Sequence, residues 1–281
     1  RLGAHVGPPA AAGGAARRMT GPGPADAQPA EFVGGNRVRL LKGGDELFPA
    51  MHNAMAAARA QVWLATYIFH DDAAGQAMAD ALRDVARRGV EVHALVDGFG
   101  SLAALPRLRD RLASDGVVFD VFRPLRGWWA LLQPAQLRRL HHKLCVVDDE
   151  VAFVGGINII DDRNDLGHGL SDQPRWDFAV ELRGPVVHQV RHLVQALGAR
   201  ARLGHEWRSE VEALARSRQP VAEALQLLRE LRTAAPSAAA SSTPPSALPP
   251  VPVAFVVRDN FARRRAIERS YIEAVRAARH A

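Results

Sequence analysis

The segment HHKLCVVDDEVAFVGGIN, residues 141–158, decides the fold and the chemistry of this chain. It has the pattern H-x-K-x4-D-x6-G-G-x-N and predicts two short apolar strands, residues 143–148 and 151–154. Residues two apart on a strand point to the same face, so His141 and Lys143 are expected to place an imidazole and an ammonium group side by side. Asp148 closes the first strand. The glycine pair before Asn158 allows close approach of the backbone.

These residue types fit phosphoryl transfer. A neutral imidazole nitrogen of His141 is a competent nucleophile. Lys143 and Asn158 can hold the non-bridging oxygens of a phosphate while its charge rearranges. The pattern therefore predicts a phosphohistidine intermediate and no metal or other cofactor. An H-x-K triplet or a glycine pair alone is common in turns and strands, but the full spacing between buried strands is rare.

The segments around this motif alternate between strands and helices. Apolar runs predict strands, and apolar residues at helical spacing predict helices between them. The expected strands are residues 38–41, 62–69, 90–96, 117–122, 143–148, 151–154 and 177–182, and the expected helices are residues 45–59, 75–88, a segment ending near 114, and a long segment from 184. This order predicts an α/β fold with a central mixed sheet flanked by helices.

Composition divides the rest of the chain. Residues 1–35 are rich in Ala, Gly and Pro and predict a disordered tail. Residues 206–250 predict a helical segment that runs into an Ala/Ser/Pro-rich linker.

After the linker, a strand at 253–257 and a helix from about 262 to the end are expected. This helix repeats the apolar spacing of the first one at a constant offset: Leu47, Met51, Ala54, Met55 and Ala58 match Ile267, Tyr271, Ala274, Val275 and Ala278. The match predicts the opening of a second copy of the domain, although two unrelated amphipathic helices can also align this well.

Charge and cysteine content narrow the classes of partner. The 281 residues carry a net charge of +6 with a pI near 10.5, which suits an anionic partner: nucleic acid, an anionic lipid surface or phosphate groups. Composition does not choose among these. The single cysteine, Cys145, rules out a disulfide within this sequence and is expected in the core. The sequence contains no run of about 20 apolar residues that would predict a transmembrane helix.

The motif resembles the HKD motif of the phospholipase D superfamily, and its surroundings resemble the bacterial cardiolipin synthases of the B type. The resemblance covers about residues 36–281 apart from an insertion at 233–250. It is carried by Ala65–Phe69 with Asp72 and Gly75, Arg88–Val90, Asp97–Ser101, Gly155–Asn158, Gly184–Val186, Arg258–Asn260 and Ile267–Arg269. It implies a first phospholipase D-like domain at 36–205, with its motif region at 136–163, and a truncated second repeat at 251–281.

The resemblance also implies roles for single residues. His141 would be the nucleophile or the general acid, with Lys143 and Asn158 on the phosphate. Asp148 belongs to the catalytic motif but is expected to act structurally, through hydrogen bonds or an ion pair. Asp177 would orient the histidine, as in other triads. The expected site consists of His141, Lys143, Asp148, Gly155, Gly156, Asn158 and Asp177.

The implied activity is transfer of a phosphatidyl group from one phosphatidylglycerol to another with release of glycerol. The implied partners are phosphatidylglycerol and other anionic phospholipids, met by peripheral association with the cytoplasmic side of the cell membrane. Arg123 to Leu132, which mixes Arg with paired Trp, suits a membrane interface or a loop packed on the domain.

Two departures from the family pattern matter. Ala65 stands where a Glu is expected, and the sequence contains no second H-x-K-x4-D. A homodimer could supply the second motif. Two alternatives therefore remain: a single-motif dimeric phosphodiesterase or nuclease, against which the start of a second repeat argues, and an inactive fragment that binds anionic lipid.

Overall fold

The structure is a computed structural model that describes residues 31–124, 139–167, 169–214, 249–257 and 266–277, with side chains of α4 up to residue 202. Two compact units divide the chain: residues 32–255 form one, and residues 1–31 with 256–281 form the other. The described helix of the second unit is α6 (Ala266–Ala277). Everything that follows about the sheet and the site concerns the unit of residues 32–255.

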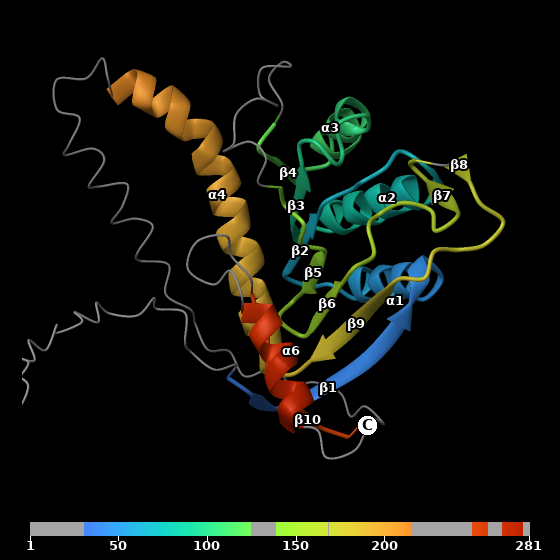
Figure 1. Ribbon diagram of the computed structural model, residues 1–281. Coiled ribbons are helices and arrows are strands. Elements are labelled where there is room, and N and C mark those ends of the chain that lie inside the picture. Colours follow the sequence, from blue (N-terminus) through green and yellow to red (C-terminus); the bar gives the residue numbers. More distant parts are fainter. Residues whose placement is uncertain (1–30, 125–138, 168, 215–248, 258–265, 278–281) are drawn as a thin grey trace, which may run out of the picture. The chain divides into compact units, whose positions relative to one another are not determined.

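An eight-stranded mixed sheet forms the centre of this unit (Figure 1). Its spatial order is β10-β1-β9-β6-β5-β2-β3-β4, with β2, β3 and β4 parallel and the other neighbours antiparallel. The strands are β1 (Val33–Lys42), β2 (Gln61–Thr66), β3 (Glu91–Asp97), β4 (Val118–Phe122), β5 (Leu144–Val147), β6 (Val151–Gly155), β9 (Phe178–Arg183) and β10 (Val251–Val253); β7 (Asn164–Asp165) and β8 (Gly169–Leu170) form a separate hairpin.

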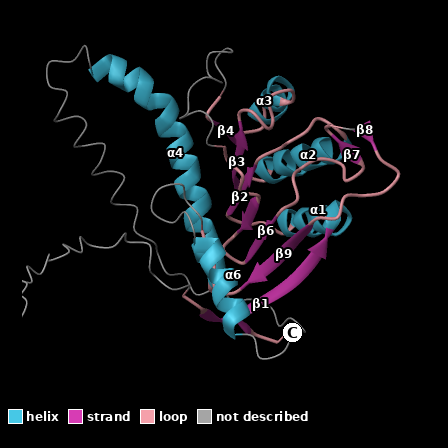
Figure 2. Cartoon of the chain, in the orientation of Figure 1, coloured by secondary structure: helices cyan, strands magenta, loops and turns pink. Residues whose placement is uncertain are grey.

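Helices cover both faces of the sheet (Figure 2). On one face, α1 (Gly43–Ala56), α2 (Ala73–Arg87) and α3 (Leu105–Ala113) pack over a core that includes Met51, Leu82 and Leu112. On the other face, α4 (Val186–Leu214) packs over a second core through Val187, Val190 and Val194. The predicted fold class, a central mixed sheet flanked by helices, is confirmed.

Strand β2 shows why the sequence folds in this way. Val62 and Leu64 face the core under α1 and α2, while Trp63 and Ala65 face the core under α4. A strand covered on both faces needs apolar residues at every position, which accounts for its unbroken apolar run. Antiparallel β5 beside it continues the same pattern, with all four residues buried.

The structure differs from the predicted elements at three places. The predicted strand 62–69 leaves the sheet after Thr66, because the backbone N–H groups of Ile68 and Phe69 bond to side chains of neighbouring loops. The long helix continues without interruption to Leu214. The last strand lies at 251–253 and pairs with β1, which places it in the same unit as the first domain. The predicted linker after 214 and most of the Arg/Trp-rich loop lie outside the described residues.

The order and direction of the strands bring the ends of five strands to one edge of the sheet. The carboxyl ends of β2, β3 and β6 lie there, together with the beginnings of β5 and β9, because β5 runs antiparallel to both β2 and β6, and β9 antiparallel to β6. The motif residues on either side of these ends are thereby brought to one place.

Candidate active site

His141 and Lys143 meet on the ring of Tyr67. The imidazole of His141 stacks on this ring with centroids 4.4 Å apart and an angle of 19° between the planes. The Nζ atom of Lys143 lies 5.4 Å from the same ring centroid and donates a hydrogen bond of 3.0 Å to the carbonyl of His141. The two side chains come together although residues 141–143 precede β5 instead of belonging to it. Tyr67, rather than strand periodicity, holds them side by side.

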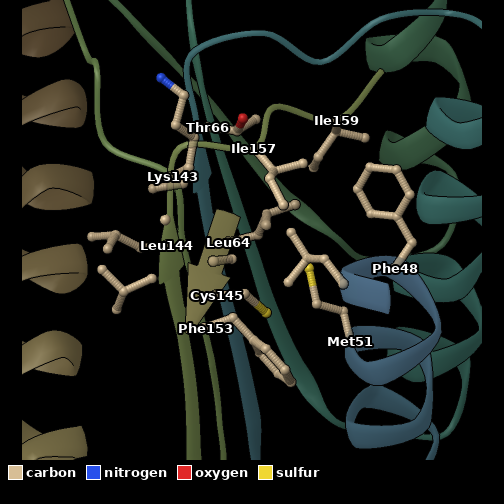
Figure 3. Close-up of a pocket in the computed structure, with 15 residues that line it drawn as sticks. Phe48, Met51, Leu64, Thr66, Lys143, Leu144, Cys145, Phe153, Ile157 and Ile159 are labelled. Atoms are coloured by element: carbon tan, nitrogen blue, oxygen red, sulfur yellow. The ribbon is translucent and has the colours of Figure 1, made fainter. Parts of the chain in front are cut away.

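The side chain of Lys143 is partly buried. Burial lowers the pKa of its ammonium group, and the negative charge of Asp177 opposes this shift. Figure 3 shows the stem of Lys143 beside a small apolar cavity, with its nitrogen directed away from Cys145, Phe153 and Met51. The cavity holds about 20 Å³, close to the space of a single water molecule, so it is a packing gap under the site and too small for an acyl chain.

The glycine pair allows the close approach that the sequence predicts. Gly155 faces Ala179 across the β6–β9 ladder, and a side chain at Gly155 would lie 2.5 Å from the Cα atom of Ala179. A side chain at Gly156 would collide with the carboxylate of Asp177. Both glycines therefore make room for β9 and for Asp177.

The hydrogen bonds that the structure describes for Asp177 go to the backbone, and its predicted role in orienting His141 stays a prediction. In the described part of the chain its Oδ1 atom accepts a hydrogen bond of 2.8 Å from the backbone N–H of Phe178, and its backbone carbonyl accepts one of 2.9 Å from Gly43. Its electrostatic effect falls on Lys143. In this arrangement the negative charge of Asp177 favours the charged form of Lys143.

Asn158 is fixed through its amide oxygen. The Oδ1 atom accepts a hydrogen bond of 3.1 Å from the backbone N–H of Ile68, just beyond Tyr67. Because oxygen and nitrogen lie on opposite sides of the amide carbon, this bond sets the direction of the Nδ2 donor. Asn158 is thereby joined to the same loop that carries the ring under His141 and Lys143.

Asp148 lies at the opposite end of β5 from Lys143. Its two carboxylate oxygens accept hydrogen bonds from the backbone N–H groups of Arg59, Ala60 and Gln61, at 2.6 to 2.8 Å. Its backbone has φ of 51°, a left-handed conformation that Asp tolerates better than most residues. The structure separates Asp148 from the other motif residues and attaches it to the segment that enters β2.

Sequence reasoning assigned no role to three residues that build the site. Asp97, fully buried at the end of β3, accepts hydrogen bonds from the backbone N–H of Leu140 at 2.8 Å and from that of Phe99 at 2.9 Å. The hydroxyl of Ser101 donates to the carbonyl of Tyr67 at 3.1 Å. Burial and the charge of Asp97 raise the pKa of Tyr67, with Arg139 opposing. The only sequence signal was the Asp-Gly-Phe-Gly-Ser turn after a buried strand.

Two further residues of the motif segment, Cys145 and His142, are shielded from solvent. Cys145 is buried in the core under α1, as predicted, and burial raises the pKa of its thiol to about 12. Burial also lowers the pKa of His142, and among the described residues its enclosed Nδ1 atom has no hydrogen-bond partner. Neither residue is placed to react.

The described residues form neither a metal site nor a membrane-spanning helix. Among them, no cluster of three or more His, Cys, Asp or Glu side chains has the arrangement of a metal site. None of the helices described has the length and apolar character needed to cross a bilayer.

Comparison with known proteins shows which family model and which proteins this chain is similar to. Residues 51–168 match the model described as "Cardiolipin synthase, PLD-like domain". The chain is 38% identical over 157 residues to cardiolipin synthase B of Salmonella typhimurium strain LT2, covering 56% of this chain and 37% of that protein. It is 40% identical over 153 residues to cardiolipin synthase A of Pseudomonas aeruginosa strain LESB58, covering 54% and 30%.

The match leaves most of each relative uncovered, since the chain spans only about a third of the length of these curated proteins. Among solved structures, Nuc from Salmonella typhimurium, described as a phospholipase D family member, aligns with 15% identity and a TM-score of 0.43, covering 57% of this chain and 93% of that one.

Proposed function

Because residues 51–168 match a family model described as "Cardiolipin synthase, PLD-like domain", we propose that this chain belongs to the phospholipase D superfamily and supplies one catalytic motif to a phosphatidyltransferase that makes cardiolipin. The observation that carries this proposal is the ring of Tyr67, which holds the imidazole of His141 and the ammonium group of Lys143 together at one edge of the sheet.

In the proposed reaction, a ring nitrogen of His141 attacks the phosphorus of one phosphatidylglycerol. The bond from phosphorus to the glycerol oxygen breaks, and that oxygen takes a proton from a general acid as glycerol leaves. A glycerol hydroxyl of a second phosphatidylglycerol then attacks the phosphohistidine. The phosphorus–nitrogen bond breaks, the hydroxyl proton passes to the same acid–base group, and cardiolipin is released.

Lys143 and Asn158 have the chemistry to hold the phosphate oxygens during both steps. The ammonium group offers a positive charge in a partly buried place, where it interacts more strongly with an anion than in water. The amide of Asn158 adds a neutral donor of fixed direction. Asp177 would keep Lys143 charged, and Asp148 would act on the fold alone.

The acid–base group needs a second histidine. The nucleophile and the general acid stand on opposite sides of the phosphorus, so one imidazole does not fill both positions in one step. This sequence contains one H-x-K-x4-D motif. A second copy of the domain, in the same polypeptide or in a partner chain, would provide the other.

The substrates we propose are phosphatidylglycerol and other anionic phospholipids, met at the cytoplasmic face of the cell membrane without a spanning helix from this domain. The net charge of +6 supports an anionic surface as partner. The same charge would also suit nucleic acid, which makes a dimeric phosphodiesterase the second candidate.

One experiment separates these functions. The protein is incubated with phosphatidylglycerol vesicles, with single-stranded DNA and with vesicles carrying phosphorus-32 in the phosphatidylglycerol head group. We expect cardiolipin, intact DNA and an acid-labile label on the protein. The His141→Ala variant should lose both cardiolipin and label, because a methyl group neither attacks phosphorus nor transfers a proton. Cleaved DNA without cardiolipin would support the second candidate, and normal synthesis by the variant would exclude His141 from the reaction.

A further inference from the structure

Three residues at alternate positions, Arg139, His141 and Lys143, gather around Tyr67. The imidazole of His141 stacks on the Tyr67 ring, and the Nζ atom of Lys143 lies 5.4 Å from the ring centroid. The charge of Arg139 acts on the Tyr67 hydroxyl, where it opposes the rise of the pKa. Arg139 is therefore a second cation, besides Lys143, at the edge of the sheet where the proposed reaction takes place.

The guanidinium group of Arg139 is held in a defined place. Its Cζ atom lies 4.9 Å from the centroid of the Phe99 ring, which attracts a cation over its face. The backbone N–H of Phe99 donates to Asp97, and the same carboxylate accepts from the N–H of Leu140, the residue after Arg139. One buried carboxylate thus fixes both the turn that carries the ring and the segment that carries the arginine.

The charge of Arg139 is left without an anion. Among the described residues its side chain contacts the Phe99 ring, and no carboxylate pairs with it. Arginines elsewhere in the domain form ion pairs, as Arg111 does with Asp80. The enclosed Nη1 atom of Arg139 has no hydrogen-bond partner in the part of the chain described. An unsatisfied N–H group is unfavourable, and a guanidinium binds phosphate oxygens through pairs of N–H bonds, so a phosphate is the ligand that suits this group.

Arg139 and Lys143 lean toward opposite sides of β5. The strands at this edge follow the order β9-β6-β5-β2-β3, and both cations belong to the segment that enters β5. The charge that acts on Lys143 is that of Asp177, just before β9. The ring that holds Arg139 is that of Phe99, just after β3. The two cations therefore offer two positions for an anion along the edge.

We propose that Arg139 binds the phosphate of the acceptor phosphatidylglycerol, which does not react, while Lys143 and Asn158 hold the phosphate that does. This inference deepens the proposed function and rests on it for the identity of the acceptor. Cardiolipin contains two phosphates joined through one glycerol, so a site that makes it holds two phosphates close together. Arg139 stays protonated throughout and takes part in no bond exchange. Its role is to select an acceptor that carries a phosphate over water or a simple alcohol.

Binding of two soluble head groups tests this assignment without catalysis. Bis(glycerophospho)glycerol carries both phosphates of cardiolipin, and glycerophosphoglycerol carries the single phosphate of phosphatidylglycerol. Titration of the full chain, followed by phosphorus-31 NMR, should give a Kd at least about tenfold lower for the two-phosphate compound, because a charged hydrogen bond contributes that factor or more. Arg139→Gln should reduce this preference to about twofold or less. A wild-type protein without the preference would overturn the proposal.

Two further variants keep the result specific. Arg109→Gln removes the same charge from an exposed position on α3 and should leave the preference unchanged. Phe99→Leu keeps an apolar side chain at a half-exposed position but removes the face on which the guanidinium lies, so the preference should fall to about threefold. Equal weakening of both compounds by Arg139→Gln would place Arg139 on the reacting phosphate. A full preference in folded Arg139→Gln, or in Phe99→Leu, would mean that no second phosphate is held there. Each of these results overturns the proposal.

The choice of acceptor tests the consequence for transfer. With phosphatidylglycerol vesicles and added ethanol, the acceptor hydroxyl of either compound can attack the phosphohistidine. Arg139→Gln should lower the ratio of cardiolipin to phosphatidylethanol about tenfold relative to wild type, and an unchanged ratio would contradict a role in acceptor selection. If the wild-type protein makes neither product but still prefers the two-phosphate head group, the proposed function fails while the phosphate site of Arg139 is supported.

Discussion

Asp97 fixes the residue that precedes His141, the nucleophile that we propose. Its carboxylate holds the backbone N–H of Leu140, the residue before His141, while its charge acts on Tyr67, on which the imidazole stacks. Reaction rates are sensitive to misplacement of a nucleophile by even 1 Å. A buried carboxylate that fixes the residue next to a nucleophile is therefore a positioning residue.

We expect Asp97→Asn to lower kcat for cardiolipin formation by about 10- to 100-fold with little change in KM. The amide nitrogen of Asn would face a backbone N–H that now donates to the carboxylate. The comparison is made below the melting temperature of both proteins. Asp120→Asn, which removes an ion pair with Arg202 on α4, serves as a control for general destabilisation. Equal losses of kcat in the two variants would mean that Asp97 acts on the fold only.

The buried charge of Lys143, which we propose binds the phosphate, should lower the free energy of unfolding. Burial lowers its folded-state pKa below the ordinary value of 10.5, so the folded protein disfavours the charged form. The unfolded chain then binds more protons between the lowered pKa and 10.5, and the contribution of Lys143 to stability rises with pH across that window. At pH values below this window, the destabilisation caused by the buried ammonium group is at its maximum.

We predict that Lys143→Met raises the free energy of unfolding by about 0.5–2 kcal/mol at pH 7 and abolishes transfer. The gain should shrink as pH rises toward 10.5, because the wild-type lysine then loses its charge. Urea unfolding at pH 7 and pH 10 measures both values. A variant less stable than wild type at pH 7, or a gain that does not change with pH, would contradict this reading of the site.

At the scale of elements, Asp148 joins two strands. It is the first residue of the β5–β6 turn and binds three successive backbone N–H groups where the chain enters β2. Arg59 and Ala60 precede β2, and Gln61 is its first residue, so Asp148 binds the backbone N–H groups at the start of this strand. Asp148, the aspartate of the HKD motif, thus connects the β5–β6 turn to the start of β2.

Replacement of Asp148 by Ala should lower stability by about 2–4 kcal/mol, because charged hydrogen bonds are lost and the left-handed backbone is strained. Activity per folded molecule should stay within about twofold of wild type. Thermal unfolding combined with active-site labelling by phosphorus-32 gives both quantities. Glu150→Ala, an exposed change in the same turn, is the matched control. Loss of labelling without loss of stability would show that Asp148 takes part in the reaction itself.

Sequence patterns predicted the elements better than their contacts. Unbroken apolar runs identified β2 and β5, and helical spacing predicted a helix at residues 75–88, close to the observed bounds of α2. Periodicity carries no information on which distant residues meet. The hydrogen bond from Leu140 to Asp97, the pairing of β1 with β10 and the place of Tyr67 under His141 all join residues far apart in the chain. Asp177 was expected at the site, but its charge acts on Lys143.

At the scale of the whole molecule, one motif in the sequence implies that an isolated copy is incomplete. We predict that monomers of this chain form cardiolipin at least about 10²-fold more slowly than any dimer it forms, since a missing general acid costs about 10²–10⁴-fold. Size-exclusion fractions of known mass are assayed with phosphatidylglycerol vesicles over a range of protein concentrations. Specific activity that rises with concentration fits a shared site. Full activity in a purely monomeric fraction would show that one motif is sufficient.

The only cysteine lies in the strand that carries the motif, sealed between layers. A water-soluble thiol reagent reaches Cys145 only when the centre of the sheet opens. This thiol is therefore a native probe of local unfolding. The labelling rate, measured against denaturant, separates brief local openings from complete unfolding without any added dye or isotope. A bound phospholipid that stabilises the packing of the two cores would lower the labelling rate of Cys145. A ligand that binds only the outer surface would leave this rate unchanged.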